Sequence, residues 1–139
     1  MNKEDKALLI KDLCARLPYN VMCQVEFKED GKHNSKVMLL SGIFTDEAYF
    51  TTKGGSIYSN EYKPYLFPLS SMTDEQKGEY NFLRDLVPSE QQYEIGNLMD
   101  NFELVDNWRS IDYLNANHFD YRGLIEYGLA IDATGLNIY

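Results

Sequence analysis

The sequence predicts one α+β domain, and three features of the 139-residue chain lead to that prediction. A helical pattern opens the chain, short alternating strand patterns follow it, and helix-start signals return after residue 72. The apolar fraction of 44% and the charged fraction of 25% are normal for a globular protein. We therefore expect a helix and a curled sheet over residues 1–72, followed by an acidic, mainly helical part over residues 73–139.

The first expected element is a helix over about residues 3–17. Asn2 is a suitable N-cap, and Pro18 is expected to end the helix. Apolar side chains recur at the spacing of one helical face, at Leu9, Ile10, Leu13, Cys14 and Leu17. The pattern predicts that this face packs on the core. Cys14 in this helix and Cys23 in the next element are both expected to be reduced and buried, and a disulfide between them is the alternative.

Four or five strands are expected next: residues 21–27, 36–44, 48–52 and 56–58 form the first four, and residues 62–69 are the candidate for the fifth. Their short loops favour antiparallel pairing, in a curled sheet or a small open barrel of the SH3-like or Sm-like kind. Gly42 predicts a bulge in the second strand, and Pro64 and Pro68 are expected to confine the last strand to a sheet edge. Such an architecture implies no function by itself.

Helical signals dominate the second half of the chain. Thr73, Ser89, Ser110 and Asp120 are suitable caps, and the first two stand three residues before Gln76 and Gln92, as in a capping box. We expect helices over about residues 74–86, 90–102, 111–117 and 121–127, with residues 103–109 irregular. A short last strand is expected over residues 129–131.

Nearly all of the net charge of −9 belongs to the second half. Residues 1–84 carry 12 acidic and 11 basic side chains, whereas residues 85–139 carry 10 acidic and only 2 basic ones. Such a surface repels phosphate backbones, which argues against duplex nucleic-acid binding by this half. The acidity fits either a basic partner or simple solubility.

The chain carries no convincing catalytic or metal-binding signature. It has two histidines, two cysteines outside any C-x-x-C pair, and no phosphate-binding glycine motif, so we expect neither a metal nor a cofactor. Residues 115–123 form its densest polar and aromatic run, and the candidate binding residues there are His118, Asp120, Tyr121 and Arg122. This run is either a small site, in the extreme case an enzyme centred on His118, or a turn that packs two helices.

The near-neutral first half offers a different candidate surface. Aromatic side chains on a curled sheet can stack single-stranded bases, and Tyr58 and Tyr62 are the candidate binding residues for that role. The alternative is that these aromatic rings fill the core of the sheet.

Three stretches resemble a known group of proteins. Residues 5–19 (DKALLIKDLCARLPY), 62–73 (YKPYLFPLSSMT) and 112–130 (DYLNANHFDYRGLIEYGLA) resemble a family of small proteins encoded by phages and mobile elements of gut Bacteroidales. The most specific part is DYRGLI at residues 120–125, while Tyr113 stands in place of a family Trp and Asn117 in place of a family His. No function is known for that family, so the resemblance implies only a bacterial cytoplasm and a phage or mobile-element context.

These observations favour a non-enzymatic accessory protein that binds another protein. Single-stranded nucleic-acid binding through Tyr58 and Tyr62 is one alternative, and a small enzyme centred on His118 is another. The N-terminal segment is charged, and its apolar run is too short for a signal peptide or a membrane span. We therefore expect a cytoplasmic protein with no membrane partner.

Overall fold

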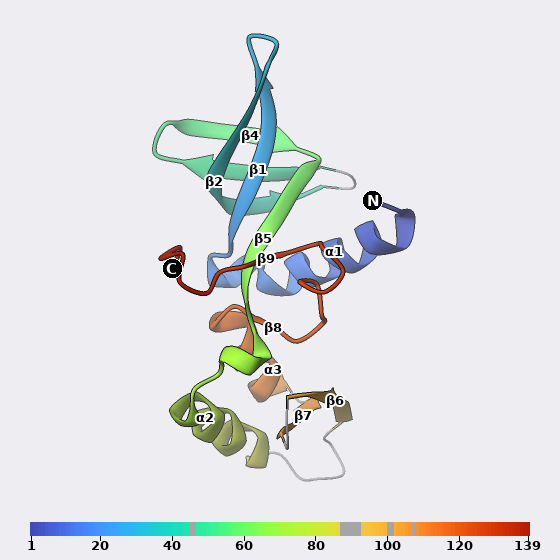
Figure 1. Cartoon of the computed structure of the whole chain (residues 1–139), viewed down its shortest axis with the longest axis vertical. Helices are drawn as coiled ribbons and strands as arrows, with labels where there is room; N and C mark the ends of the chain where they lie inside the picture. The colour runs from blue at the N-terminus through green and yellow to red at the C-terminus, as the bar shows by residue number, and fades with distance from the viewer. Residues whose placement is uncertain (45–46, 87–92, 100–101, 107) are drawn as a thin grey trace.

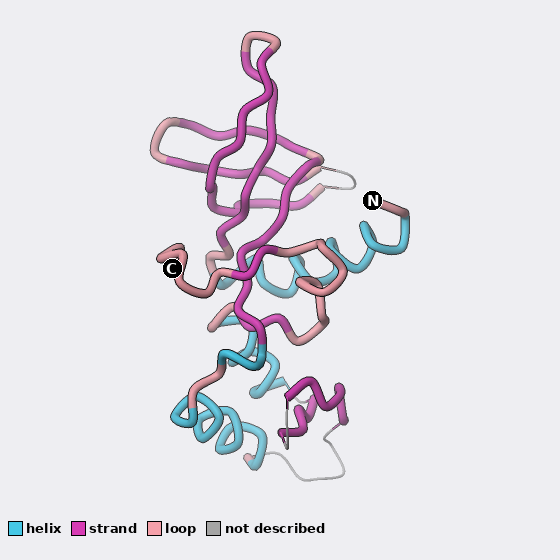
Figure 2. The backbone as a smooth tube through the Cα atoms, in the orientation of Figure 1, coloured by secondary structure: helices cyan, strands magenta, loops and turns pink. Residues whose placement is uncertain are grey.

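The computed structural model describes residues 1–44, 47–86, 93–99, 102–106 and 108–139. It shows an elongated α+β molecule with a curled sheet at one end and helices at the other (Figure 1). Figure 2 shows the curled sheet in the upper part, and most of the helices together with a separate pair of strands in the lower part. The predicted fold class is therefore confirmed. No helix within the described ranges is long and apolar enough to cross a membrane.

The first helix, α1, covers Lys3–Arg16 and ends in a short 3-10 turn, Leu17–Tyr19. Asn2 caps α1 as predicted, because its side chain accepts a hydrogen bond of 2.8 Å from the backbone nitrogen of Asp5. Cys23 is buried, but Cys14 is exposed, so the prediction that Cys14 packs on the core is wrong. Asp12 and Arg16 of the same helix are buried instead.

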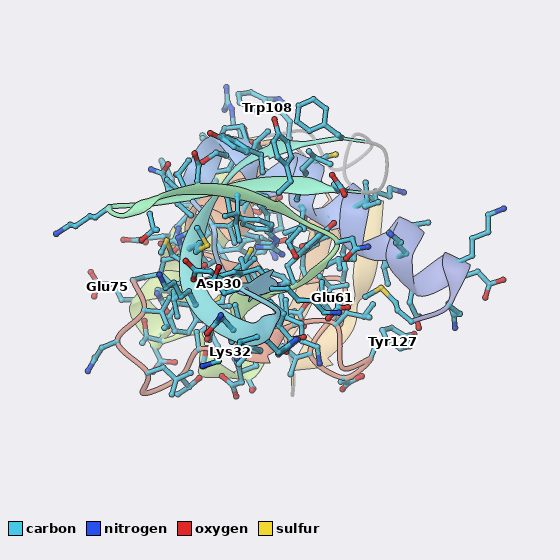
Figure 3. The ribbon with its side chains drawn as sticks, turned by 90° about the horizontal axis from the view of Figure 1, so that it is seen from above. Asp30, Lys32, Glu61, Glu75, Trp108 and Tyr127 are labelled. Atoms are coloured by element: carbon cyan, nitrogen blue, oxygen red, sulfur yellow. The ribbon has the colours of Figure 1, made fainter. Side chains whose placement is uncertain are left out.

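The five predicted strands are β1 (Met22–Glu29), β2 (Lys32–Ile43), β3 (Ala48–Thr52), β4 (Gly55–Ser59) and β5 (Glu61–Pro68). They are antiparallel in the order β4-β3-β2-β1-β5, and the sheet stays open. The β1–β2 hairpin extends beyond the sheet as an arm (Figure 1), whose tip carries Asp30 and Lys32 (Figure 3). The predicted bulge is confirmed by a register shift between Leu40 and Gly42.

The expectation that β5 is an edge strand is wrong. It pairs with β1 over Glu61 to Pro64, and then with two short parallel strands, β8 (Phe119–Asp120) and β9 (Ile131–Asp132). The ladder to β1 ends at Pro64 and the ladder to β9 begins at Tyr65. Proline is tolerated in this interior strand because both prolines lie at the end of a ladder.

The second half is less helical than expected. Helix α2 covers Asp74–Asp85, and its predicted capping box is confirmed by reciprocal bonds between Thr73 and Gln76 of 2.9 and 3.1 Å. A 3-10 turn, Leu69–Ser71, precedes it, and the predicted helix near residues 111–117 is α3, Trp108–Ala116. Ser110 lies inside α3 and is buried, so it is not the cap.

Two of the expected helices are absent from the described part of the chain. Within the ranges expected as helix 90–102 and irregular 103–109, the described residues Tyr93–Met99 (β6) and Phe102–Asp106 (β7) instead form an antiparallel hairpin. Residues 108–109 belong to α3. Gly96 disfavours a helix there by about 1 kcal/mol, and strand pairing satisfies the same backbone groups. The proposed capping box at Ser89 and Gln92 lies outside the described residues.

The expected helix over residues 121–127 is a series of turns. Asp120 does cap this segment, since its carboxylate accepts 2.9 Å hydrogen bonds from the backbone nitrogens of Leu124 and Ile125. The helix fails to form because Gly123 adopts a positive φ of 76°, a left-handed conformation that interrupts helical hydrogen bonding. The last strand is also displaced, from the predicted 129–131 to β9.

The described residues form two apolar core clusters. One joins α1 to the sheet and includes Leu9, Leu13, Val25, Phe50 and Leu66. The other joins α2, α3 and β8 and includes Met72, Tyr80, Leu114, Phe119 and Tyr121. Each fully buried large apolar side chain contributes roughly 1.5–3 kcal/mol to folding. Residues 115–122 lie where these two clusters meet.

Candidate functional site

The candidate residues of the second half lie inside the molecule. His118, Asp120 and Tyr121 are buried, and Arg122 is partly buried. His118 adopts a positive φ of 62°, and its carbonyl accepts a hydrogen bond of 2.8 Å from the backbone nitrogen of Phe67. This conformation turns the chain from α3 into β8, so the run 115–122 connects the helical end to the sheet.

A buried charge cluster, consisting of Asp12, Arg16 and Arg122, joins α1 to this run. Arg16 donates to both carboxylate oxygens of Asp12, at 2.7 and 3.2 Å, and to the backbone oxygen of Phe119 at 2.7 Å. The Nε atom of Arg122 lies 3.2 Å from Asp12 Oδ1, as an ion pair without hydrogen-bond geometry. The cluster therefore fixes α1 against β8.

Tyr121 contacts both guanidinium groups of this cluster. The Cζ atoms of Arg16 and Arg122 are each 5.1 Å from the centroid of its ring, a cation–π distance. The hydroxyl of Tyr121 donates to Asn115 Oδ1 at 3.0 Å. The ring and the hydroxyl are thus both occupied by contacts within the chain.

Asp120 is buried, and both of its carboxylate oxygens bind backbone groups of the same chain. Burial raises its pKa, while the hydrogen bonds from Ile125 and Leu124 and the charge of Arg16 oppose that shift. Its two oxygens each accept one of the backbone hydrogen bonds. The geometry therefore supports a capping role for this carboxylate.

His118 is covered by the C-terminal residue. Its ring stacks on Tyr139 with centroids 3.6 Å apart and an interplanar angle of 11°. Burial, and then the nearby charge of Arg16, lower the pKa of His118 from 6.5 to about 4, so the ring is neutral at neutral pH. A general base must reach its substrate, and only 9% of His118 is exposed, so this geometry does not support catalysis.

Tyr58 and Tyr62 do not share a surface. Tyr62 is 5% exposed and packs its ring 5.2 Å from Phe50 in the core. Tyr58 is 57% exposed and contacts Tyr49 and Phe44, at centroid distances of 4.9 and 5.7 Å. We call Phe44, Tyr49 and Tyr58 the aromatic trio. The two tyrosines predicted to stack bases therefore lie on different sides of the sheet.

The structure adds an apolar groove between α2 and α3. This α2–α3 groove has a volume of about 430 Å³ and is lined by Gly78, Glu79, Phe82, Leu83 and Tyr113. Phe82 leaves 66% of its surface exposed there. The hydroxyl of Tyr113 donates to Glu79 Oε2 at 2.7 Å, and burial together with this hydrogen bond raises the pKa of Tyr113. The groove thus has a fixed aromatic wall on one side.

Gly78 is one of the residues that line this groove. A Cβ atom added there would meet nothing within 4 Å, so no close packing requires a glycine. The absent side chain keeps the groove open between the two helices.

Some residues of these sites were not predicted, although their spacing in the sequence carries a signal. Asp12 and Arg16 are four residues apart, the spacing of an ion pair along a helix. Gly78 and Phe82 have the same spacing, and a glycine inside a predicted helix is unusual. Neither pattern shows from sequence alone whether it faces the core or the solvent.

Comparisons with known proteins identify no relative: no family model, no curated protein and no solved structure matches the chain. The described residues also contain no group of three or more histidine, cysteine or acidic side chains placed to hold a metal ion. The candidate surface with the best geometry is therefore the α2–α3 groove.

Proposed function

We propose that this chain is a non-enzymatic protein-binding module whose α2–α3 groove receives an amphipathic helix of a partner protein. The observation that carries the proposal is Phe82, a large apolar side chain that is 66% exposed in an apolar groove. Exposed apolar surface of this kind is typical of interaction sites. Aromatic side chains also contribute much of the binding energy at protein interfaces.

Gly78 supports a binding role for the groove. A glycine inside a helix reduces its stability by about 1 kcal/mol relative to alanine. Because open space surrounds the position, the fold gains no packing in return. A partner side chain would occupy the space that the missing side chain leaves.

A helix is the occupant that this shape favours. Grooves between packed helices accept apolar side chains that recur at helical spacing on a partner. Glu79 lines the groove, and Glu75 acts electrostatically on Tyr113 in its wall. The protein as a whole carries a net charge of −9. A helix with one apolar face and basic flanks is complementary to this surface.

We also propose a phage or mobile-element accessory role in a bacterial cytoplasm. Only the sequence resemblance of residues 5–19, 62–73 and 112–130 supports it. The expected partner is then a protein of the host or of the mobile element. We do not propose nucleic-acid binding or catalysis, because Tyr62 and His118 are buried.

A peptide selection tests the groove directly. We expect the protein to select basic, amphipathic helical sequences from a random peptide library. The variant Phe82→Ser should bind the selected peptides at least about tenfold more weakly, since it removes the main apolar contact. Affinity is measured by fluorescence anisotropy of labelled peptides.

Tyr127→Ser is the matched control for this experiment. Tyr127 is also 66% exposed, but it lies on the opposite side of the molecule from Glu75 of α2 (Figure 3). The control should bind as the parent protein does. If no peptide is enriched, or if the peptides bind Phe82→Ser as tightly as the parent, the proposed function is wrong.

A further inference from the structure

Glu79 is the charged residue among those that line the α2–α3 groove. It lies on α2, three residues before Phe82, and residues at this spacing are neighbours on one face of a helix. Both side chains are exposed. A partner helix that contacts Phe82 would therefore pass beside the carboxylate of Glu79 as well.

Tyr113 of α3 holds this carboxylate in place. Its hydroxyl donates to Glu79 Oε2 at 2.7 Å, and burial, followed by this hydrogen bond, raises the pKa of Tyr113, so the hydroxyl remains a donor at neutral pH. Exposed ion pairs contribute little because two mobile side chains must be ordered to form them. Since Tyr113 already orders Glu79, a cation of the partner pairs with it at a smaller entropic cost.

The hydrogen bond from Tyr113 also decides which cation fits best. Within the described part of the chain, Tyr113 is the one hydrogen-bond partner of the Glu79 carboxylate, and it uses only Oε2. The strongest contact of an arginine with a carboxylate is bidentate and takes both oxygens. A lysine is a compact point charge and needs only one oxygen, so Oε1 is sufficient for it.

We propose that Glu79, held by Tyr113, selects a lysine over an arginine on the helix that the α2–α3 groove receives, an inference that rests on the proposed function. Glu79 is then the specificity-determining residue and Tyr113 its positioning residue. Because Glu79 and Phe82 are about one helical turn apart, the lysine is expected about one turn from the apolar partner residue that contacts Phe82.

Peptides from a random helical library test this selectivity. Those selected by the parent protein should carry lysine at this position, and replacing that lysine by arginine should weaken binding about fivefold, as measured by fluorescence anisotropy. In Tyr113→Phe both oxygens of Glu79 are accessible, so the difference between the lysine and arginine peptides should disappear. Glu79→Gln should bind the lysine peptides about fivefold more weakly than the parent does.

Glu75→Gln is the matched control for the charge. Glu75 lies one turn earlier on α2 and is not among the residues that line the groove, so this variant loses the same charge outside the site. It should weaken binding of the lysine peptides by less than about twofold at physiological salt, because exposed charges are screened over that distance. Thermal unfolding of each variant checks that the fold is intact.

The outcomes separate this inference from the proposed function. If no peptide is enriched, both are overturned. If peptides bind through Phe82 but tolerate Glu79→Gln, or bind equally well with lysine and arginine, only the selection by Glu79 is overturned. Equal effects of Glu75→Gln and Glu79→Gln would overturn it too, because the general acidity of α2 would then explain the binding. A lysine preference that persists in Tyr113→Phe would overturn the positioning role of Tyr113.

Discussion

Arg16 is fully buried, although arginine is rarely found inside proteins. Its neighbours make this possible: Asp12 neutralises the charge, and the backbone oxygen of Phe119 accepts a further hydrogen bond. Breaking such a pair by removing one partner leaves an uncompensated buried charge, which costs more than the pair itself contributes. The cluster therefore specifies how α1 sits on the rest of the chain, more than it adds to stability.

His118 makes the stability of the protein sensitive to acid. Its pKa lies at about 4 in the folded chain and near 6.5 in the unfolded chain, so the unfolded state binds the proton more readily. The contribution of the neutral His118 to stability is therefore fully present above pH 6.5, and it is lost as the pH decreases from 6.5 towards 4. The loss is less than about 1.4 kcal/mol per pH unit, the limit for one proton. Urea unfolding at several pH values measures it.

His118→Asn is the informative comparison, because asparagine tolerates the positive φ of this position and does not titrate. The variant should be less stable at neutral pH but lose less stability between pH 6.5 and 4. Asp120 acts in the opposite sense, since its raised pKa favours the protonated form in the folded state. Its contribution is present in both proteins and cancels in their difference. Equal acid sensitivity of the two proteins would contradict the assignment to His118.

At the scale of elements, α2 combines a well-formed start with a weak centre. Its capping box satisfies the first backbone groups, whereas Gly78 lowers helix stability in the middle. Gly78→Ala should raise the free energy of unfolding by about 0.5–1 kcal/mol, as measured by urea denaturation, because the added methyl group meets open space.

Gly31→Ala is the control of opposite sign, since its positive φ of 74° strains any residue with a Cβ atom and the change should destabilise the fold by roughly 1 kcal/mol. If Gly78→Ala destabilises the protein as well, then α2 is packed more closely at this point than the structure indicates. A stabilised Gly78→Ala protein with weakened peptide binding would show that the glycine serves the groove.

At the scale of the whole molecule, Tyr139 connects segments that lie far apart in the sequence. The hydroxyl of Tyr139 donates to the backbone oxygen of Tyr65 at 2.7 Å and accepts from the backbone nitrogen of Met22 at 2.9 Å. Its ring stacks on His118. One side chain thus connects the C-terminus to β1, β5 and the start of β8.

Tyr139→Phe keeps the stacked ring and removes only the hydroxyl. It should lower the free energy of unfolding by about 1 kcal/mol, because two backbone groups lose a partner. Tyr127→Phe, at an exposed position, should have almost no effect. Both are measured by urea denaturation at neutral pH. Equal effects of the two substitutions would show that the hydroxyl contacts of Tyr139 contribute nothing to stability.

Local patterns in the sequence determined the elements with short-range causes. Asn2 at the start of α1, Thr73 with Gln76 at the start of α2, and the bulge at Gly42 all follow from contacts within a few residues. The five antiparallel strands were equally predictable, because alternating apolar residues and glycine-containing turns specify neighbouring strands. Only the tertiary structure placed β5 inside the sheet, because its partners Phe119 and Ile131 lie far along the chain.

Long-range packing also decided the candidate sites. Periodicity shows that a helix has faces but not which face meets the core, so the buried Asp12 and Arg16 and the exposed Phe82 appeared only in three dimensions. The polar run 115–123 was visible in the sequence, yet its burial depends on α1 and Tyr139, which lie at the two ends of the chain. The α+β class of this protein thus follows from its sequence alone, whereas its surfaces follow from contacts between distant segments.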